Sequence, residues 1–211
     1  MTTGLLDRIA PFSNPTNIRF TPVDLTKLSG AKMKGFPLLH LLDLMQTHGA
    51  DTATRWRDTV PEALRPQTER AAITSVSWIP MEFYFHGVEW LAREKYGGVR
   101  GALVIGHDAA KRDIGAFFRM VMSLTSPATI LGFSGRFWRS YFDTSTLQLN
   151  KTTGNSVSAE IRDWPLRDET SLHEMCGSLV AWLEASRAPN VRMHRFEITR
   201  PGTLSLEISW G

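Results

Sequence analysis

The fold class is decided by the C-terminal part of the chain, which begins SPATILGFSGRFWRSYFDTSTLQLN (126–150) and predicts an aromatic-rich helix that runs into a β-strand. A second strand is predicted in SVSAEIRDWPL (156–166). An amphipathic helix follows in ETSLHEMCGSLVAWLEAS (169–186), and a hairpin in VRMHRFEITRPGTLSLEISW (191–210). The order helix, strand, strand, helix, hairpin predicts an α+β architecture.

The predicted strands have a period of two. Apolar side chains alternate strictly with polar ones from Leu204 to Trp210, and a similar alternation runs through residues 157–161. The first two strands are joined by TTGN (152–155), in which Gly154 adopts positive φ without steric cost. Because each strand has one apolar and one polar face, we expect an antiparallel sheet that helices cover on one face.

The N-terminal half shows helical periodicity instead. Pro80 suits the first turn of its strongest helix, which ends at Gly97, and Pro127 opens a later helix that runs to Phe142. Asp108 is expected to cap the helix between these two. Earlier helices are predicted in GFPLLHLLDLMQTHG (35–49), DTATRWRDTV (51–60) and PEALRPQTERAA (61–72), the last of them shortened or bent by Pro66.

In the C-terminal helix, Ser171 and Glu174 have the spacing of a capping box. The buried face of that helix is predicted to contain Leu172, Met175, Cys176, Leu179, Val180 and Leu183. On this assignment Glu174 points away from the apolar stripe, and Cys176 is a small core residue whose thiol is inert.

Residues 1–30 contain three prolines and no sustained period, so we expect a loosely structured arm, with a possible short strand at 18–20. Residues 31–211 are expected to form one α+β ligand-sensing-like domain. The N-terminus does not have the pattern of a signal peptide, and no run approaches the about 18 apolar residues of a membrane span. A cytoplasmic protein is the expectation.

The composition excludes several classes of protein. The net charge is +3, and Lys and Arg are scattered rather than gathered in a stripe, so a nucleic-acid partner is not expected. A single cysteine excludes an intramolecular disulfide and a multi-cysteine zinc site. Seven Trp and 11 Phe are many for 211 residues, and they indicate a bulky aromatic core, an aromatic-lined cavity or a partner surface.

A family resemblance rests on the order RFWRSYFDTSTLQL (136–149), a strand ending in RDWPL (162–166), the helix MCGSLVAWLE (175–184) and a closing hairpin. This order resembles the superfamily of 4-vinyl-reductase-type ligand-sensing domains, haem-NO-binding-like sensors and small subunits of transport-particle (TRAPP) tethering complexes. Within it, the sequence is similar to an uncharacterised paralogous family abundant in myxobacteria, through segments 34–49, 77–91 and 125–143.

The resemblance implies a domain that holds a small hydrophobic ligand between helices and sheet, or that uses the same scaffold to dimerise. Some relatives hold zinc through cysteines near the last hairpin, but MHRFEITRPGTLSLEIS (193–209) has none. Haem-binding relatives use an axial His and a Tyr-x-Ser-x-Arg signature, which SYFDTS (140–145) does not match. We therefore expect neither a metal nor a cofactor.

The aromatic group around residues 127–142 is the strongest candidate for a ligand site. Its residues could form core, line an apolar pocket or pack against a second subunit. The candidate ligand-binding residues are Phe117, Phe118, Phe133, Phe137, Trp138, Tyr141, Phe83 and Trp90.

His86 offers a weaker alternative. Glu82 and Glu89 share its helix face, so a metal cluster is conceivable, although a hydrogen-bonded structural role is the more common outcome. No nucleophile elbow, P-loop or paired-carboxylate motif occurs, so an enzyme is not expected.

Three functions remain open. The first is a non-enzymatic sensor that binds a small hydrophobic ligand and signals through protein contacts. The second is a homodimeric scaffold or adaptor that recruits a protein partner without a ligand. The third is a haem- or metal-dependent sensor.

Overall fold

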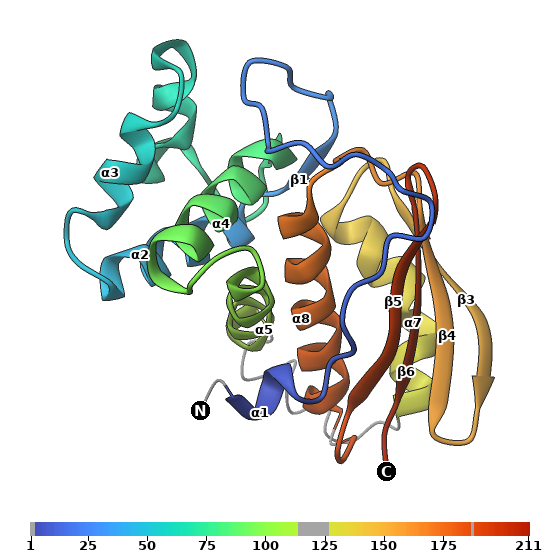
Figure 1. The fold of residues 1–211 in the computed structure, drawn as a ribbon. Coiled ribbons are helices and arrows are strands. Elements are labelled where there is room, and N and C mark those ends of the chain that lie inside the picture. The colour runs from blue at the N-terminus through green and yellow to red at the C-terminus, as the bar shows by residue number, and fades with distance from the viewer. Residues whose placement is uncertain (1–2, 114–126, 187) are drawn as a thin grey trace.

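The chain folds into a helical N-terminal half and a C-terminal half that combines a four-stranded antiparallel sheet with two helices (Figure 1). The computed structural model describes residues 3–113, 127–186 and 188–211. The predicted α+β class, with helices first and the sheet last, is confirmed.

Five helices and a two-stranded ribbon are described before residue 114. They are α1 (Thr3–Leu6), β1 (Lys32–Lys34), α2 (Phe36–Thr47), α3 (Thr52–Asp58), β2 (Trp78–Pro80), α4 (Met81–Lys95) and α5 (Gly101–Asp113), with 3₁₀ segments at Glu62–Thr68 and Arg70–Ala72. The later elements are α7 (Pro127–Tyr141), β3 (Thr146–Thr153), β4 (Ser156–Arg162), α8 (Glu169–Ala185), β5 (Arg192–Arg200) and β6 (Thr203–Ser209).

The large sheet has the strand order β3-β4-β6-β5, and every neighbouring pair is antiparallel. Its register pairs Val157 with Ile208, and Ala159 with Leu206. These four apolar side chains are buried on one face of the sheet, against which α7 and α8 lie. The period-two alternation therefore predicted the buried face correctly.

Helix α8 separates the sheet from the remaining helices, and α5 packs on its far side (Figure 1). The two helices meet backbone to backbone at Gly106 and Gly177. A Cβ at Gly106 would lie 2.0 Å from the carbonyl oxygen of Glu174, and one at Gly177 would lie 1.9 Å from that of Leu103. Only glycine permits this approach.

The N-terminal arm is attached at several points. Ile9 bridges to Met193 and Ser13 to Glu197 in parallel, so the arm runs along the edge strand β5. Two carboxylates of α4 hold its later part: Glu89 accepts the backbone N–H of Val23 at 3.1 Å, and Glu82 that of Ser29 at 2.6 Å. The predicted strand at 18–20 is wrong, because these residues form no strand ladder.

Two expectations about helices in the first half are corrected. Helix α5 begins at Gly101, so Asp108 lies in its interior rather than at its cap; the apolar run before it, Ala102 to Ile105, is buried and belongs to the same helix. Residues 61–72 form 3₁₀ segments rather than an α-helix. Pro66 lies within the first of them, and its ring and missing N–H disfavour an α-helix there.

The start of α8 also differs from the prediction. The helix begins at Glu169, and the cap is Asp168, whose carboxylate accepts the backbone N–H of Ser171 at 2.6 Å. Glu174 consequently lies inside the helix and is buried. The capping-box assignment of Ser171 and Glu174 is therefore wrong, because the helix begins earlier and Asp168 already supplies the cap.

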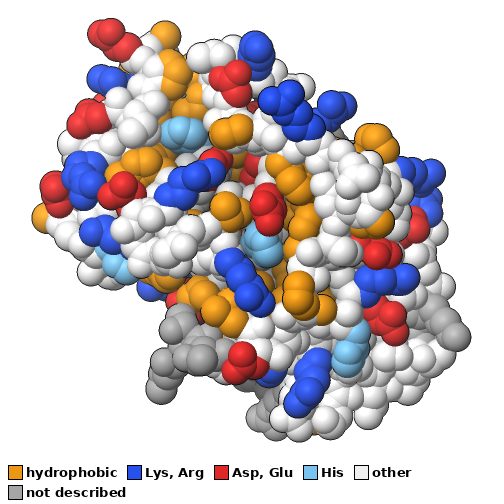
Figure 2. Space-filling model, in the orientation of Figure 1, with side chains coloured by type: hydrophobic (Ala, Val, Ile, Leu, Met, Phe, Trp, Pro, Cys, Tyr) orange, Lys and Arg blue, Asp and Glu red, His pale blue; other side chains and the backbone are white. Residues whose placement is uncertain are grey.

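Surface composition and helix length complete the description. On the face drawn in Figure 2, basic side chains are interspersed with acidic ones rather than collected in a stripe. Among the described residues, no helix combines the length and the apolar character needed to cross a membrane.

Candidate functional site

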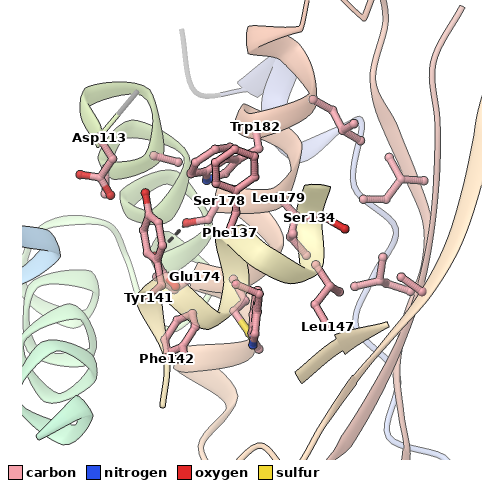
Figure 3. Close-up of a pocket in the computed structure, with 18 of the residues that line it drawn as sticks. Asp113, Ser134, Phe137, Tyr141, Phe142, Leu147, Glu174, Ser178, Leu179 and Trp182 are labelled. Atoms are coloured by element: carbon pink, nitrogen blue, oxygen red, sulfur yellow. Dashed lines mark hydrogen bonds between the residues drawn. The ribbon is translucent and has the colours of Figure 1, made fainter. Parts of the chain in front are cut away.

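A cavity of about 120 Å³ lies between α7, α8 and the buried face of the sheet (Figure 3). Its walls are mainly apolar. Helix α7 contributes Ser134, Phe137, Trp138 and Tyr141; α8 contributes Glu174, Ser178, Leu179 and Trp182; and the sheet contributes Leu147, Leu149, Ala159 and Leu206. Tyr84 of α4 and Asp113 of α5 also line it.

The wall on α7 follows from helical spacing. Phe137 and Trp138 follow Ser134 by three and four positions, and Tyr141 follows them by four and three, so the four residues share one side of the helix. The indole N–H of Trp138 donates to the Ser145 hydroxyl at 2.9 Å, which fixes the orientation of that ring. Helix α8 supplies the facing ring: the centroid of Trp182 lies 5.6 Å from that of Phe137 and 5.9 Å from that of Tyr141.

Glu174 is the most unusual residue of the cavity. Its side chain is only 5% exposed, and its Oε1 accepts hydrogen bonds from the Tyr84 hydroxyl at 2.8 Å and the Ser178 hydroxyl at 3.0 Å. Figure 3 shows the Ser178 bond beside Tyr141. Burial raises the pKa of Glu174 to about 7, although both hydrogen bonds act in the opposite direction. Its Oε2 accepts no hydrogen bond from the described residues.

A second carboxylate, Asp113, lies at the end of α5 and is paired with His40 of α2 through Nδ1. Burial raises the pKa of Asp113, and the hydrogen bond to Asp113 raises the pKa of His40. No Lys or Arg lines the cavity among the residues that the structure describes. The polar character of the described wall is therefore acidic.

The predicted ligand-binding residues have different positions. Phe137, Trp138 and Tyr141 line the cavity. Phe83 is fully buried in the core on α4, and Trp90 is half-buried on the same helix; neither reaches the cavity. Phe133 is 47% exposed and does not line it either. Phe117 and Phe118 lie outside the described residues. A ligand-binding role for these residues stays a prediction.

The sequence reasoning missed the half of the cavity that α8 and its neighbours supply. Glu174, Ser178 and Trp182 follow one another at intervals of four and form a second inward row beside the apolar stripe. A charged residue at an inward position of a buried helix could have indicated this row. The spacing of Glu174 from Ser171 predicted a capping box instead.

The cluster around His86 is structural. The indole N–H of Trp56 donates to His86 Nδ1 at 3.0 Å, while Glu82 and Glu89 accept backbone N–H groups of the N-terminal arm. Across residues 3–113, 127–186 and 188–211, no three His, Cys, Asp or Glu side chains are grouped as metal ligands would be. Cys176 is buried, as predicted, and burial raises the pKa of its thiol.

Solved structures with a similar fold are H-NOX proteins. The chain resembles the Fe(II) unliganded H-NOX protein from K. algicida with a TM-score of 0.64 and 12% identity, over 85% of this chain and 97% of that one. A single-residue variant of the H-NOX protein from T. Tengcongensis gives a TM-score of 0.54 and 12% identity, over 84% and 97%. A structure that probes haem distortion in the H-NOX family gives 0.55 and 13%, over 84% and 95%.

At this identity the comparisons establish the fold alone. They support the haem-NO-binding part of the predicted resemblance and not its other branches. No protein-family model matches the sequence, and no curated protein matches it.

The residues present do not fit haem, the group that this fold implies. All six histidines of the chain lie in described residues, and none lines the cavity; the single cysteine does not line it either. Tyr84 and Tyr141 line the cavity, but burial raises the pKa of each, which opposes the tyrosinate that iron would require. Met33 and Met175 also line it, but an axial methionine acts together with a histidine, and no histidine lines the cavity. No described Arg or Lys lines the cavity to receive the propionates. The cavity volume suits a molecule much smaller than haem.

Proposed function

We propose that this chain is a non-enzymatic sensor domain that binds a small hydrophobic ligand between α7, α8 and the sheet, and signals through protein contacts. The observation that carries the proposal is the apolar cavity of about 120 Å³ walled by Phe137, Trp138 and Tyr141. Concave sites that are lined mainly by apolar and aromatic side chains, with a few polar groups, are where proteins bind small molecules. The fold shared with the H-NOX structures, one of which was solved to probe haem distortion, supports a ligand-binding role by analogy.

The cavity volume limits the size of the ligand. An engineered apolar cavity of about 150 Å³ binds benzene, so a ligand with one aromatic ring matches this cavity. Such a molecule has about eight non-hydrogen atoms, and ligand efficiencies of about 0.3 to 1.5 kcal/mol per atom then give a binding free energy between about 2 and about 12 kcal/mol. The midpoint of this range, about 7 kcal/mol, corresponds to a Kd of about 10 µM.

Helix α7 is the element through which binding would be transmitted. Its residues Phe137 and Tyr141 line the cavity, and Phe133, one turn earlier, lies outside the cavity and is exposed. A ligand that shifts α7 would thus change the position of an exposed aromatic side chain, which is suited to a protein contact. The alternative function, a homodimeric adaptor that acts without a ligand, requires dimerisation that is independent of the cavity.

The test is thermal stabilisation by toluene. At a free concentration of ten times Kd, a ligand of the native state stabilises it by about 1.4 kcal/mol, which is measurable as a rise in Tm. The variant Ala159→Leu places three more carbon atoms in the cavity and is expected to abolish the rise. Ser158→Val, on the opposite face of the same strand, is the matched control and should keep it.

Two outcomes oppose the proposal. If toluene, ethylbenzene and indole all leave Tm unchanged, the cavity does not bind apolar ligands. If Ala159→Leu responds like the unmodified protein, the ligand binds elsewhere. Light scattering tests the adaptor alternative, which predicts that the unmodified protein and Ala159→Leu are both dimers.

A further inference from the structure

The carboxylate of Glu174 has half of its hydrogen-bonding capacity unused inside an apolar cavity. Both protein donors, Tyr84 and Ser178, approach Oε1, while Oε2 accepts no bond from the described residues. The Ser178 hydroxyl also lies 3.1 Å from the carbonyl oxygen of Gly106, and it has one proton to donate. A buried carboxylate is costly unless it is paired, so the cavity lacks a donor at Oε2.

From this geometry we infer that the ligand of the cavity is a small aromatic or branched aliphatic amine whose ammonium group binds Glu174 Oε2. This inference rests on the proposed function and names the chemical class of its ligand. The ammonium supplies the missing donor and the missing positive charge, and the apolar part of the molecule fills the space beside Leu147 and Leu179.

The charges around the cavity select against other ligand classes. Asp113, the other carboxylate of the wall, is already paired with His40, and no described Lys or Arg lines the cavity. A carboxylate or phosphate ligand would meet Glu174 without a compensating cation. A neutral hydrocarbon fits the volume but leaves Oε2 unpaired, so the amine is favoured over it.

The aromatic walls favour a cation as well. Phe137, Tyr141 and Trp182 line the cavity together with Glu174. Faces of aromatic rings attract ammonium groups, most strongly where water is excluded. A carboxylate beside aromatic walls is a combination that suits a primary ammonium on an apolar body.

The binding of the amine should depend on pH, with a defined sign. Burial raises the pKa of Glu174 to about 7. The titratable groups that face it are Tyr84 from α4, Asp113 from α5 with its partner His40, Tyr141 from α7, and Asp168 at the start of α8. Only ionised Glu174 binds an ammonium well, so affinity for an amine that stays protonated rises between pH 6 and pH 8.

The experiment is calorimetric titration of the full chain with benzylamine, toluene, benzyl alcohol and benzoate at pH 6 and pH 8. Benzylamine is expected to bind at least tenfold tighter than toluene at pH 8, and this advantage should shrink severalfold at pH 6. Benzoate should bind more weakly than toluene at both. The pH comparison uses the unmodified protein, so it holds even if a variant fails to fold.

A matched pair of variants locates the effect. Glu174→Gln should bind toluene as before but lose the preference for benzylamine and its pH dependence. Glu169→Gln, on the same helix outside the cavity, should keep both.

The outcomes separate this inference from the proposed function. Toluene binding without a preference for benzylamine would overturn the inference and leave the proposed function standing. If no compound binds, the proposed function fails as well.

Discussion

Helix α8 has two contrasting sides. Toward α5 it approaches so closely that backbone atoms meet at Gly106 and Gly177, with no room for a single Cβ. Toward α7 and the sheet it borders a cavity of about 120 Å³. The same helix therefore packs at the closest possible distance on one side and leaves space on the other. The difference indicates that the space is confined to one side of α8, and that α8 is not loosely packed as a whole.

The carboxylates of the two regions differ in the same way. Glu82 and Glu89 of α4 accept backbone N–H groups of the N-terminal arm and so connect two segments of the chain. Glu174 of α8 is also buried, and like Glu82 it keeps one oxygen without a described partner; the difference is that Glu174 lines the cavity, whereas Glu82 and Glu89 do not. A buried glutamate is thus structural in one region and a candidate binding group in the other.

The largest effect is expected from Gly177→Ala, which disrupts the close contact between α8 and α5. The added Cβ would lie 1.9 Å from the backbone oxygen of Leu103, which cannot move without displacing α5. We expect a loss of more than about 3 kcal/mol in the free energy of unfolding, measured by urea denaturation.

The control for that substitution is Gly132→Ala on α7, where no atom lies within 4 Å of the added Cβ. It should gain up to about 1 kcal/mol, because alanine is the better helix former. Equal effects of the two substitutions would show that the α5–α8 contact is not as close as described.

The substitution Glu174→Gln tests the side of α8 that borders the cavity. Burial raises the pKa of Glu174 from 4.5 to about 7 in the folded state. The folded protein therefore disfavours the ionised form, and the resulting cost is absent below about pH 4.5 and reaches about 3 kcal/mol above pH 7. Relative to the unmodified protein, Glu174→Gln should gain stability between pH 5 and pH 8. A stability difference that stays constant with pH would contradict this assignment.

The wall that α7 presents to the cavity depends on the hydrogen bond from Trp138 to Ser145. Both side chains are buried, so Trp138→Phe leaves the Ser145 hydroxyl without this partner. We expect a loss of about 1 to 3 kcal/mol by chemical denaturation. The double variant with Ser145→Ala should recover part of that loss; a purely additive double variant would mean that the bond is not formed in solution.

The smallest effect concerns His40, the partner of the cavity residue Asp113. The hydrogen bond to Asp113 raises the pKa of His40, so the pair contributes stability below the ordinary histidine value and loses it as pH rises through the raised one. NMR titration should place the His40 pKa above 6.5, and Asp113→Asn should lower it. An unchanged titration in Asp113→Asn would exclude this pair as the cause.

Much of the fold could be predicted because its signals are local. The strict alternation from Leu204 to Trp210 corresponds to the buried face of β6, and the helix predicted at Pro80 begins one residue later. The start of α8 was mispredicted, since Ser171 and Glu174 have capping-box spacing while Asp168 supplies the cap. Because a glutamate in a helix cap faces solvent, this assignment did not predict that Glu174 is buried beside the cavity.

The sequence by itself determined the α+β class, the order of most elements and the aromatic side of α7, because periods of two and 3.6 residues record which side of each element is buried. Only the tertiary structure decided that Tyr84, Asp113, Glu174 and Tyr141 meet at one cavity, and that Phe83 does not. Those residues come from four helices, and their proximity depends on how closely the helices approach one another. Local periodicity carries no information about that distance.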